Sequence, residues 1–280
     1  MQIMRKAFVA SALLLATGSG ASQNNEPNMP AAMPAGLPRG YLALDDLPDS
    51  LLLLSPPPAV GTAAFARDEE VSKAMERPPA SARFRLAASD ADLKFPHAPG
   101  AFNCAIGVTV DPKMTPKLYE LMGKAAIDIG LSTYKAKKHY QRVRPFVAHG
   151  NNSCFPPDEA ALRSDGSYPS GHSALGWGWA LILTEIAPDR ADAILQRGRD
   201  FGQSRLVCNV HWASDVDAGR LMASATFARL HADAAFRADV AAASAELSRA
   251  TKPDAATCTA EAEALANSGK KPTRSQGSPG

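Results

Sequence analysis

The chain has 280 residues, of which 45% are hydrophobic, enough to bury a substantial core in one large domain or two small ones. The formal net charge is +2 at pH 7 and no basic run is interleaved with aromatic residues, which argues against a nucleic-acid partner. Beyond the first residues, no apolar stretch is long enough to cross a membrane, so we expect a soluble mature protein without a membrane partner.

The N-terminal residues have the pattern of a secretory signal. Arg5 and Lys6 precede an apolar run from Ala7 to Ala16, and small and polar residues follow. Such a run is too short to span a bilayer, so we predict a cleaved signal peptide at residues 1–22 and export, to the periplasm if the source is a Gram-negative bacterium. Residues 23–40 are rich in Asn, Pro and Met and are predicted to be mobile.

The next segment, from Tyr41 to Pro99, carries scattered prolines and short helical patterns, which predicts an irregular wrap around a core. From Thr115 the pattern changes, because apolar residues recur at spacings of three and four. This predicts a helix that is capped by Thr115, begins at Pro116 and continues to about Tyr140. Four further helices are predicted at Ser170–Ile186, Arg190–Val207, Ala213–His231 and Ala234–Ala250.

No alternating apolar strand pattern and no internal repeat is present in the sequence. We therefore predict an all-α fold with a single helical domain at residues 41–250. Residues 251–280 are rich in Lys, Ser, Gly and Pro, and they are predicted to form a disordered tail.

Three clusters of polar residues stand out within the predicted helical block. They are Lys137 with Arg144 and Pro145; Pro169, Ser170, Gly171 and His172; and Ser204 and Arg205 with His211 and Asp215.

The cations and the helix start in these clusters are suited to binding an oxyanion. Lys137, Arg144 and Arg205 are cations that together suit a phosphate dianion, and arginine matches two phosphate oxygens at once. Ser170 and Gly171 lie where a loop becomes a helix, so backbone N–H groups there can face an anion.

The histidines add the chemistry of phosphoryl transfer. His211 and Asp215 are four residues apart, so on one helix face the carboxylate can hold one ring N–H while the other nitrogen attacks phosphorus. A protonated His172 can then give its proton to the leaving alkoxide. Because three cations neutralise the developing charge, we expect no metal and no other cofactor.

The three clusters resemble the signature of the type 2 phosphatidic acid phosphatase (PAP2) superfamily. Their surroundings, GSYPSGH at 166–172 and GQSRLVCNVHWASDVDAGR at 202–220, are similar to the class A bacterial non-specific acid phosphatases. The resemblance covers residues 115–235, and the proline-rich segment 55–58 is similar to the N-terminal region of that class.

The resemblance implies an all-helical fold in which the three clusters converge on one phosphate pocket. It implies an acid phosphatase that hydrolyses a broad range of phosphate monoesters, including nucleotides and sugar phosphates, through a phosphohistidine, with phosphotransfer to other alcohols as a further activity. By position, Lys137, Arg144, Ser170, Gly171 and Arg205 bind phosphate; His172 is the acid, His211 the nucleophile and Asp215 its partner.

Vanadate, which mimics the transferring phosphoryl group, is expected to inhibit. The same residue pattern is shared with vanadium-dependent haloperoxidases, so this oxidoreductase activity is the alternative function. The pattern leaves the oligomeric state open.

Residues near the clusters have simpler expected roles. Lys138 and Arg142 are predicted to share a helix with Lys137 and to face solvent. Gly176 and Gly178 are predicted to allow close packing of helices.

The four cysteines are even in number in a chain predicted to enter an oxidising compartment, and they allow three disulfide connectivities. Cys154 and Cys208 each follow a phosphate-binding arginine, and both arginines must reach one phosphate. This favours Cys154–Cys208 and, less directly, Cys104–Cys258. A free, buried Cys208 and a Cys104–Cys154 pair remain as alternatives.

Overall fold

The computed structural model describes residues 39–266. The predicted signal peptide at 1–22, most of the predicted mobile segment 23–40 and the end of the predicted tail, 267–280, lie outside the described residues.

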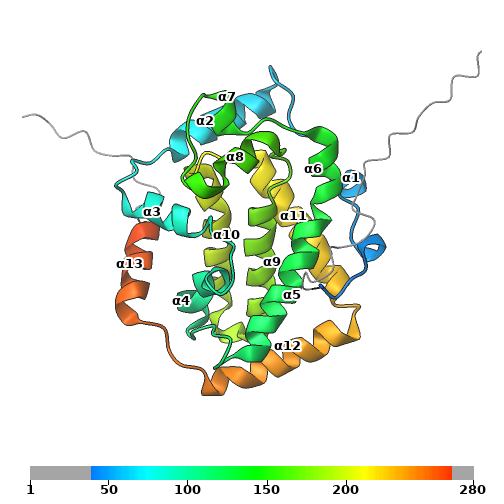
Figure 1. The fold of residues 1–280 in the computed structure, drawn as a ribbon, viewed down its shortest axis with the longest axis vertical. Coiled ribbons are helices and arrows are strands. Elements are labelled where there is room, and N and C mark those ends of the chain that lie inside the picture. The colour runs from blue at the N-terminus through cyan, green and yellow to red at the C-terminus, as the bar shows by residue number, and fades with distance from the viewer. Residues whose placement is uncertain (1–38, 267–280) are drawn as a thin grey trace, which may run out of the picture. The chain divides into compact units, whose positions relative to one another are not determined.

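Helix α9 (Gly171–Ile186) is the central element of the fold. It packs on α10 (Ala191–Val207), α11 (Ala213–Leu230) and α5 (Pro116–Ser132), and Figure 1 shows it in the middle of the bundle, between α10 and α5. Buried side chains occur on every side of α9, as expected for a helix that is apolar all round. The predicted all-α class is confirmed, since residues 39–266 contain helices and no strand.

The other elements surround this core. Helix α12 (Ala234–Glu246) crosses the lower end of the bundle in Figure 1. The short elements in chain order are η1 (Leu44–Asp46), α1 (Ser50–Leu53), α2 (Ala63–Met75), α3 (Ala82–Ser89), η2 (Ala98–Phe102), α4 (Asn103–Ile106), α6 (Tyr134–Tyr140), α7 (Pro145–Ala148), α8 (Pro156–Ser164), η3 (Pro188–Arg190), η4 (Leu247–Arg249) and α13 (Ala255–Ala266).

Two glycines set the distance between α9 and its neighbours. A Cβ at Gly176 would lie 2.4 Å from the ring of Phe201 on α10, and a Cβ at Gly178 would lie 2.4 Å from Ile129 on α5. These distances are far below van der Waals contact, so only glycine allows the helices to approach so closely. The predicted packing role of both glycines is therefore confirmed.

The predicted start of α5 is right and Thr115 occupies the N-cap position, but its side chain makes no capping hydrogen bond. The Thr115 hydroxyl instead bonds the backbone of Asp111, accepting from N at 2.8 Å and donating to O at 3.1 Å. The carboxylate of Glu246, at the end of α12, accepts from the N–H groups of Lys117 and Leu118 at 3.0 and 3.1 Å. The negative charge of a carboxylate at a helix N-terminus also interacts favourably with the positive end of the helix dipole. The predicted extension to Tyr140 is divided at Thr133, where α5 ends and α6 begins.

The predicted disordered tail is wrong for residues 255–266, which form α13. The disorder-promoting residues of the segment lie mainly after 266, whereas 255–266 is rich in alanine, the best helix former. Cys258 of α13 is bonded to Cys104, and the carboxylate of Glu261 lies 3.5 Å from Nε of Arg197 on α10.

Both favoured disulfides are present. Cys104–Cys258 has a Cα–Cα distance of 5.4 Å and Cys154–Cys208 one of 4.6 Å, so the free Cys208 and the Cys104–Cys154 pair are excluded.

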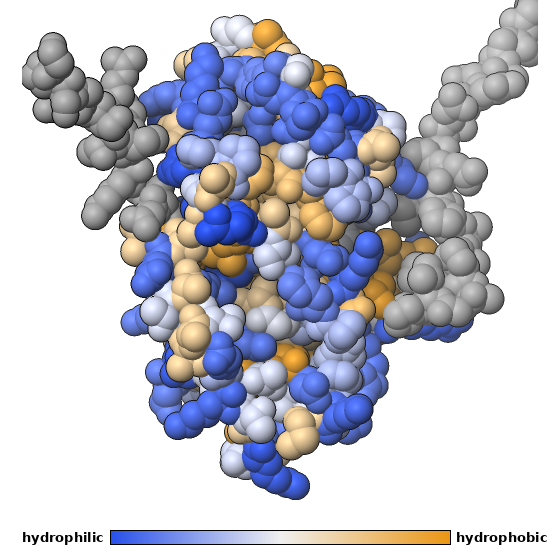
Figure 2. Space-filling view, turned by 60° about the vertical axis from the view of Figure 1, so that its left-hand side comes forward, coloured by the Kyte–Doolittle hydropathy of each residue, from blue (hydrophilic) through white to orange (hydrophobic). Residues whose placement is uncertain are grey.

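The face in Figure 2 is mostly hydrophilic, with apolar residues gathered in its upper middle. Among the described helices, none has both the length and the apolar character of a membrane span.

Loss of the Cys104–Cys258 bridge should destabilise the fold strongly. The bridge spans 154 residues, so we expect Cys104→Ser/Cys258→Ser to lower the free energy of unfolding by about 3–5 kcal/mol, mainly by freeing the unfolded chain. Guanidinium unfolding followed by circular dichroism measures this, with Thr259→Ala on exposed α13 surface as control. An unchanged unfolding midpoint in the double variant would show that the bridge adds nothing to stability.

Candidate active site

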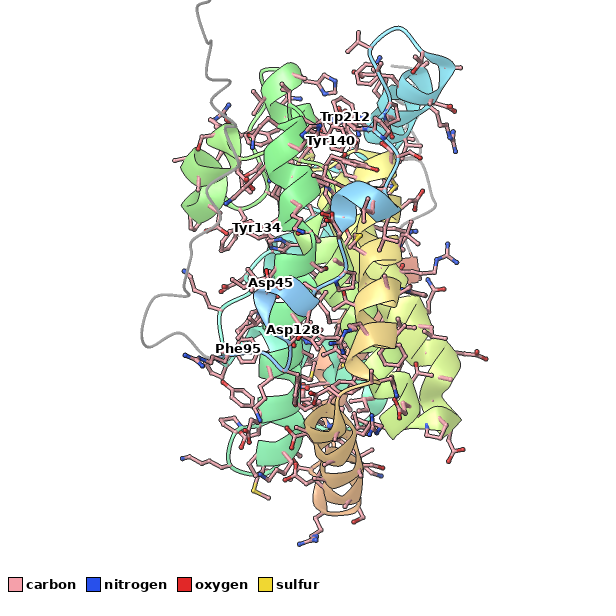
Figure 3. The ribbon with its side chains drawn as sticks, turned by 90° about the vertical axis from the view of Figure 1, so that its right-hand side faces the viewer. Asp45, Phe95, Asp128, Tyr134, Tyr140 and Trp212 are labelled. Atoms are coloured by element: carbon pink, nitrogen blue, oxygen red, sulfur yellow. A yellow bond between two sulfur atoms is a disulfide. The ribbon has the colours of Figure 1, made fainter. Side chains whose placement is uncertain are left out.

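The three polar clusters meet at one end of the helical bundle. Ser170, at the start of α9, donates its N–H to Asp215 O on α11 at 3.0 Å. Phe146, at the start of α7, donates to Asn209 O in the turn between α10 and α11 at 2.8 Å. In Figure 3, Tyr140 and Trp212 mark this end, well above Asp128 and Phe95.

Backbone carbonyls hold the first two cations in place. Lys137 Nζ donates to Gly166 O at 2.8 Å. Arg144 donates to Val210 O and Asp165 O, both at 3.0 Å, and to Gly166 O at 3.1 Å. Burial, with the charge of Arg144, lowers the pKa of Lys137 to about 8. Carbonyls fix the position of these cations but leave their positive charge uncompensated.

One carboxylate lies beside this pair. Asp165 Oδ2 is 3.2 Å from Arg144 Nη2 and 3.8 Å from Lys137 Nζ. The Asp165 side chain is 48% exposed, so water screens its interaction with both cations.

Arg205 is the least compensated cation of the cluster. It lies in the last turn of α10 and is only 2% exposed. It forms no ion pair with a carboxylate of the described chain, and its Nε has no hydrogen-bond partner there. Burial, with the repulsion of Arg144, lowers the pKa of Arg205 to about 9. The guanidinium therefore stays charged at neutral pH and is free to bind an anion.

The contacts of His211 define its tautomer. Its Nε2 lies 3.1 Å from Arg144 Nη1, and arginine can only donate, so Nε2 must be the acceptor and Nδ1 carries the proton. Burial, followed by the charges of Arg144, Lys137 and Arg205, holds the pKa of His211 well below its usual range. His211 is therefore neutral, with an unprotonated nitrogen facing the cations.

Asp215 lies on the Nδ1 side of this ring, as the spacing predicts. Its Oδ2 is 3.4 Å from His211 Nδ1, but the geometry gives no hydrogen bond between them. The reason is that His211 precedes α11, while Asp215 caps the helix by accepting the N–H of Trp212 at 2.8 Å.

His172 is the second residue of α9 and has the opposite tautomer. Its Nε2 lies 3.1 Å from Ala91 O, which can only accept, so Nε2 carries a proton and Nδ1 is the other exchangeable position. Burial, and then the charge of Arg205, holds the pKa of His172 well below its usual range.

The structure corrects the expected role of the Ser170 N–H. This group is already used by Asp215 O, and Ser170 Oγ caps α9 by accepting from Ser173 N at 3.2 Å. Within residues 39–266, the N–H groups of Gly171 and His172 in the first turn of α9 have no such partner. These two groups are the ones that can face an anion.

Arg142 is a second correction, because it is buried and not solvated. Helix α6 ends at Tyr140, and Gln141 has a left-handed backbone with φ of 42°, so the chain turns at that point. The Arg142 side chain is 8% exposed and contacts Asp215 Oδ1 at 2.6 Å and Asp68 Oδ2 at 2.7 Å. Asp68, on α2, was not predicted from sequence, since it lies among ordinary charged residues of an amphipathic helix.

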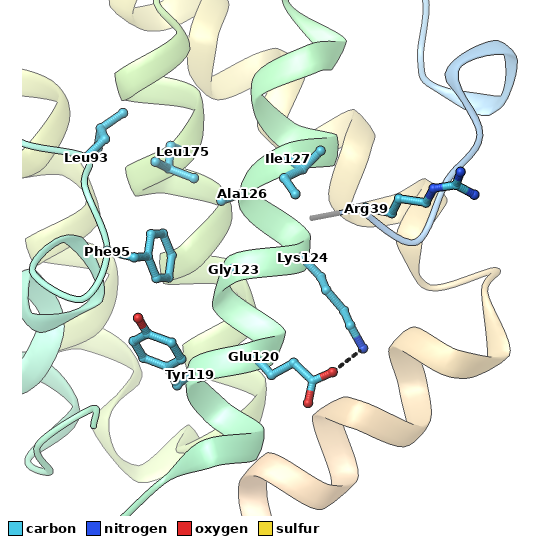
Figure 4. A pocket seen from close by; sticks show the side chains of 10 residues that line it. All are labelled: Arg39, Leu93, Phe95, Tyr119, Glu120, Gly123, Lys124, Ala126, Ile127 and Leu175. Atoms are coloured by element: carbon cyan, nitrogen blue, oxygen red, sulfur yellow. Dashed lines mark ion pairs between the residues drawn. The ribbon is translucent and has the colours of Figure 1, made fainter. Parts of the chain in front are cut away.

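A separate cavity of about 700 Å³ lies beside α5 (Figure 4). Its lining is mainly apolar and includes Leu93, Phe95, Tyr119, Ile127 and Leu175. No residue of the three clusters lines it, so it is separate from the candidate active site.

Comparisons with known proteins agree with this geometry. Residues 121–238 match the model of the PAP2 superfamily. The chain is 37% identical over 247 residues to a non-specific acid phosphatase of Providencia stuartii, covering 88% of this chain and 96% of that protein. It is 43% identical to an acid phosphatase of Zymomonas mobilis, covering 72% of this chain and 76% of that protein. It is 40% identical to a non-specific acid phosphatase of Salmonella typhimurium, covering 69% and 78% respectively. The chain belongs to the bacterial non-specific acid phosphatases of the PAP2 superfamily and is a phosphoric monoester hydrolase.

Proposed function

We propose that hydrolysis proceeds through a phosphohistidine on Nε2 of His211. The observation that carries this proposal is the unprotonated Nε2 held beside Arg144, in a cluster whose third cation, Arg205, has no carboxylate partner in the described chain. Nε2 attacks phosphorus, the N–P bond forms and the bond to the leaving oxygen breaks. In the second step, water attacks phosphorus and Nε2 leaves.

His172 handles the proton in both steps. Its Nδ1 gives a proton to the leaving alkoxide and later takes one from the attacking water. Nε2 stays bonded to Ala91 O, which fixes the ring. Replacing water by another alcohol in the second step gives phosphotransfer without any change in the site.

Lys137, Arg144 and Arg205 stabilise the charge that develops on the phosphoryl oxygens, together with the first N–H groups of α9. With three cations in these positions, the mechanism needs no metal. The same arrangement is expected to bind vanadate as an inhibitor.

The proposed roles of the site residues all concern the phosphoryl group and none concerns the leaving group, which supports a broad range of phosphate monoesters, including nucleotides and sugar phosphates. The charged and apolar pattern of residues 5–16, together with the bacterial relatives, supports export to the periplasm. The three relatives described above carry the name acid phosphatase, so hydrolysis is favoured over the haloperoxidase alternative.

Trapping the phosphoenzyme should distinguish the roles of the two histidines. We expect His211→Ala to form no phosphoenzyme, because the nucleophile is gone. His172→Ala should still form one from p-nitrophenyl phosphate, whose leaving group needs no proton. Rapid quench with radioactive substrate measures this, with His231→Ala, at the far end of α11, as control. An acid-labile phosphoenzyme in the His211 variant would contradict the assignment.

Asp165 should compete with phosphate for Lys137 and Arg144. We expect Asp165→Asn to lower the inhibition constant of inorganic phosphate about two- to fivefold, the range of an exposed ion pair. Competitive inhibition assays measure this. The control is Asp189→Asn, an exposed site in η3 after the opposite end of α9. Weaker phosphate inhibition in Asp165→Asn would mean that this carboxylate helps the anion to bind.

The pH dependence should follow the proton of His172. Because the pKa of His172 is lowered, the acid is lost as pH rises, while His211, whose pKa is also lowered, stays neutral down to low pH. For alkyl phosphates we expect the maximum of kcat below about pH 7. With p-nitrophenyl phosphate the fall on the basic side should be weaker, which is the internal control. A maximum above about pH 8 for alkyl phosphates would refute this role.

A further inference from the structure

We propose that Asp68 and Arg142 are positioning residues that hold the carboxylate of Asp215 in place beside the nucleophilic histidine. This inference rests on the proposed function of His211. It assigns part of the catalytic apparatus to the N-terminal wrap, since Asp68 belongs to α2, outside the PAP2 match at 121–238.

Arg142 bridges two buried carboxylates. Its Nη1 donates to Asp215 Oδ1 at 2.6 Å, and its Nη2 donates to Asp68 Oδ2 at 2.7 Å. Asp215 is fully buried and Asp68 is nearly so. Arg142 therefore occupies one oxygen of Asp215 and leaves Oδ2 for Trp212 N and the side that faces His211 Nδ1.

Asp68 also binds the first turn of α11 directly, through Ser214. Its Oδ1 accepts from Ser214 N at 2.9 Å, and its Oδ2 accepts from Ser214 Oγ at 2.6 Å. Ser214 Oγ also accepts from Arg142 Nη1 at 2.7 Å. Since Ser214 directly precedes Asp215 in the first turn of α11, Asp68 controls both the arginine and the backbone that carries the carboxylate.

Aromatic rings shield this network from water. The Arg142 guanidinium lies 5.4 Å from the ring of Trp212 and 5.9 Å from that of Phe65, and these two rings are 5.3 Å apart. Cation–π contacts add to the ion pairs, and exclusion of water strengthens them.

The electrostatic role follows from the opposing effects on Asp215. Burial raises the pKa of its carboxyl group, and Arg142 is the largest influence that lowers it. Without Arg142, Asp215 would take up a proton at higher pH and would no longer favour the Nδ1–H tautomer of His211. The other charged or titratable groups that face Asp215 are His211, Lys137, Arg144 and Tyr168, with Asp68 behind Arg142.

The test compares Arg142→Gln with wild type in two independent measurements. We expect kcat to fall about 10- to 100-fold, as is common when a supporting partner is removed, while KM and phosphate inhibition are unchanged because the phosphate cations remain. The acid limb of the kcat profile should move to higher pH, because Asp215 becomes protonated more easily. A merely structural role would not move the acid limb.

The second measurement is the tautomer of His211 by ¹⁵N NMR of the imidazole, assigned by comparison with His211→Asn. We expect Nδ1–H in wild type, where both Arg144 and Asp215 favour it, and a lower fraction of Nδ1–H in Arg142→Gln, where Arg144 alone favours it. This readout does not require turnover. If wild type forms no phosphohistidine but the tautomer still depends on Arg142, the proposed function fails and the positioning role stands.

Three variants complete the experiment. Arg67→Gln removes an arginine from the exposed face of α2 and should behave as wild type. Arg142→Lys, which keeps the charge but not the bridge, should restore the acid limb and only part of kcat. Asp68→Asn keeps an oxygen that can accept from Ser214 N but loses the second acceptor oxygen, so we expect a smaller loss of kcat. If Arg142→Gln does not fold, Asp68→Asn is the variant that tests the proposal. Wild-type kcat, acid limb and tautomer in a folded Arg142→Gln or Asp68→Asn would overturn the proposal.

Discussion

The structure depends on three buried cations that have only one carboxylate beside them in the described residues, the half-exposed Asp165. Lys137, Arg144 and Arg205 are almost inaccessible to water, and desolvating a cation is costly unless it is paired. Carbonyl oxygens offset part of this cost for Lys137 and Arg144, and Asp165 adds a screened interaction. Within residues 39–266, Arg205 has neither a carbonyl partner nor a carboxylate partner. We propose that the site is a preformed receptor for an oxyanion, and its occupation should then stabilise the whole domain.

The rest of the fold supplies the rigidity that keeps these cations together. Close approach of α10 and α5 to α9, permitted by Gly176 and Gly178, fixes the helix ends on which the site is built. The Cys154–Cys208 bridge joins the segment after α7 to the end of α10, which carries Arg205. Without such restraints, mutual repulsion would separate the cations.

The long helices and the motif residues could be predicted from the sequence, but several contacts of the site could not. Spacing of apolar residues predicted the long helices, and the need for two arginines to reach one phosphate predicted a disulfide. The inward turn of Arg142 depends on the left-handed Gln141, and its partner Asp68 is distant in sequence, so neither had a local signal. The engaged N–H of Ser170 depends on the packing of α9 against α11. Helix 255–266 was not predicted because the composition was averaged over residues 251–280, and the Lys, Ser, Gly and Pro residues after 266 outweighed the alanine-rich part.

Replacing the unpaired cation tests the central claim most directly. Arg205→Met keeps most of the bulk of the side chain but removes the buried charge. Replacing even a buried ion pair by apolar side chains is often neutral or stabilising by about 1–4 kcal/mol, and a buried cation without a carboxylate partner lacks the attraction that offsets desolvation in a pair. Thermal unfolding would be measured with and without vanadate for wild type and variant. We predict that the free variant is at least as stable as free wild type, and that vanadate raises the Tm of wild type only. A variant that is clearly less stable than wild type and is still stabilised by vanadate would contradict the account.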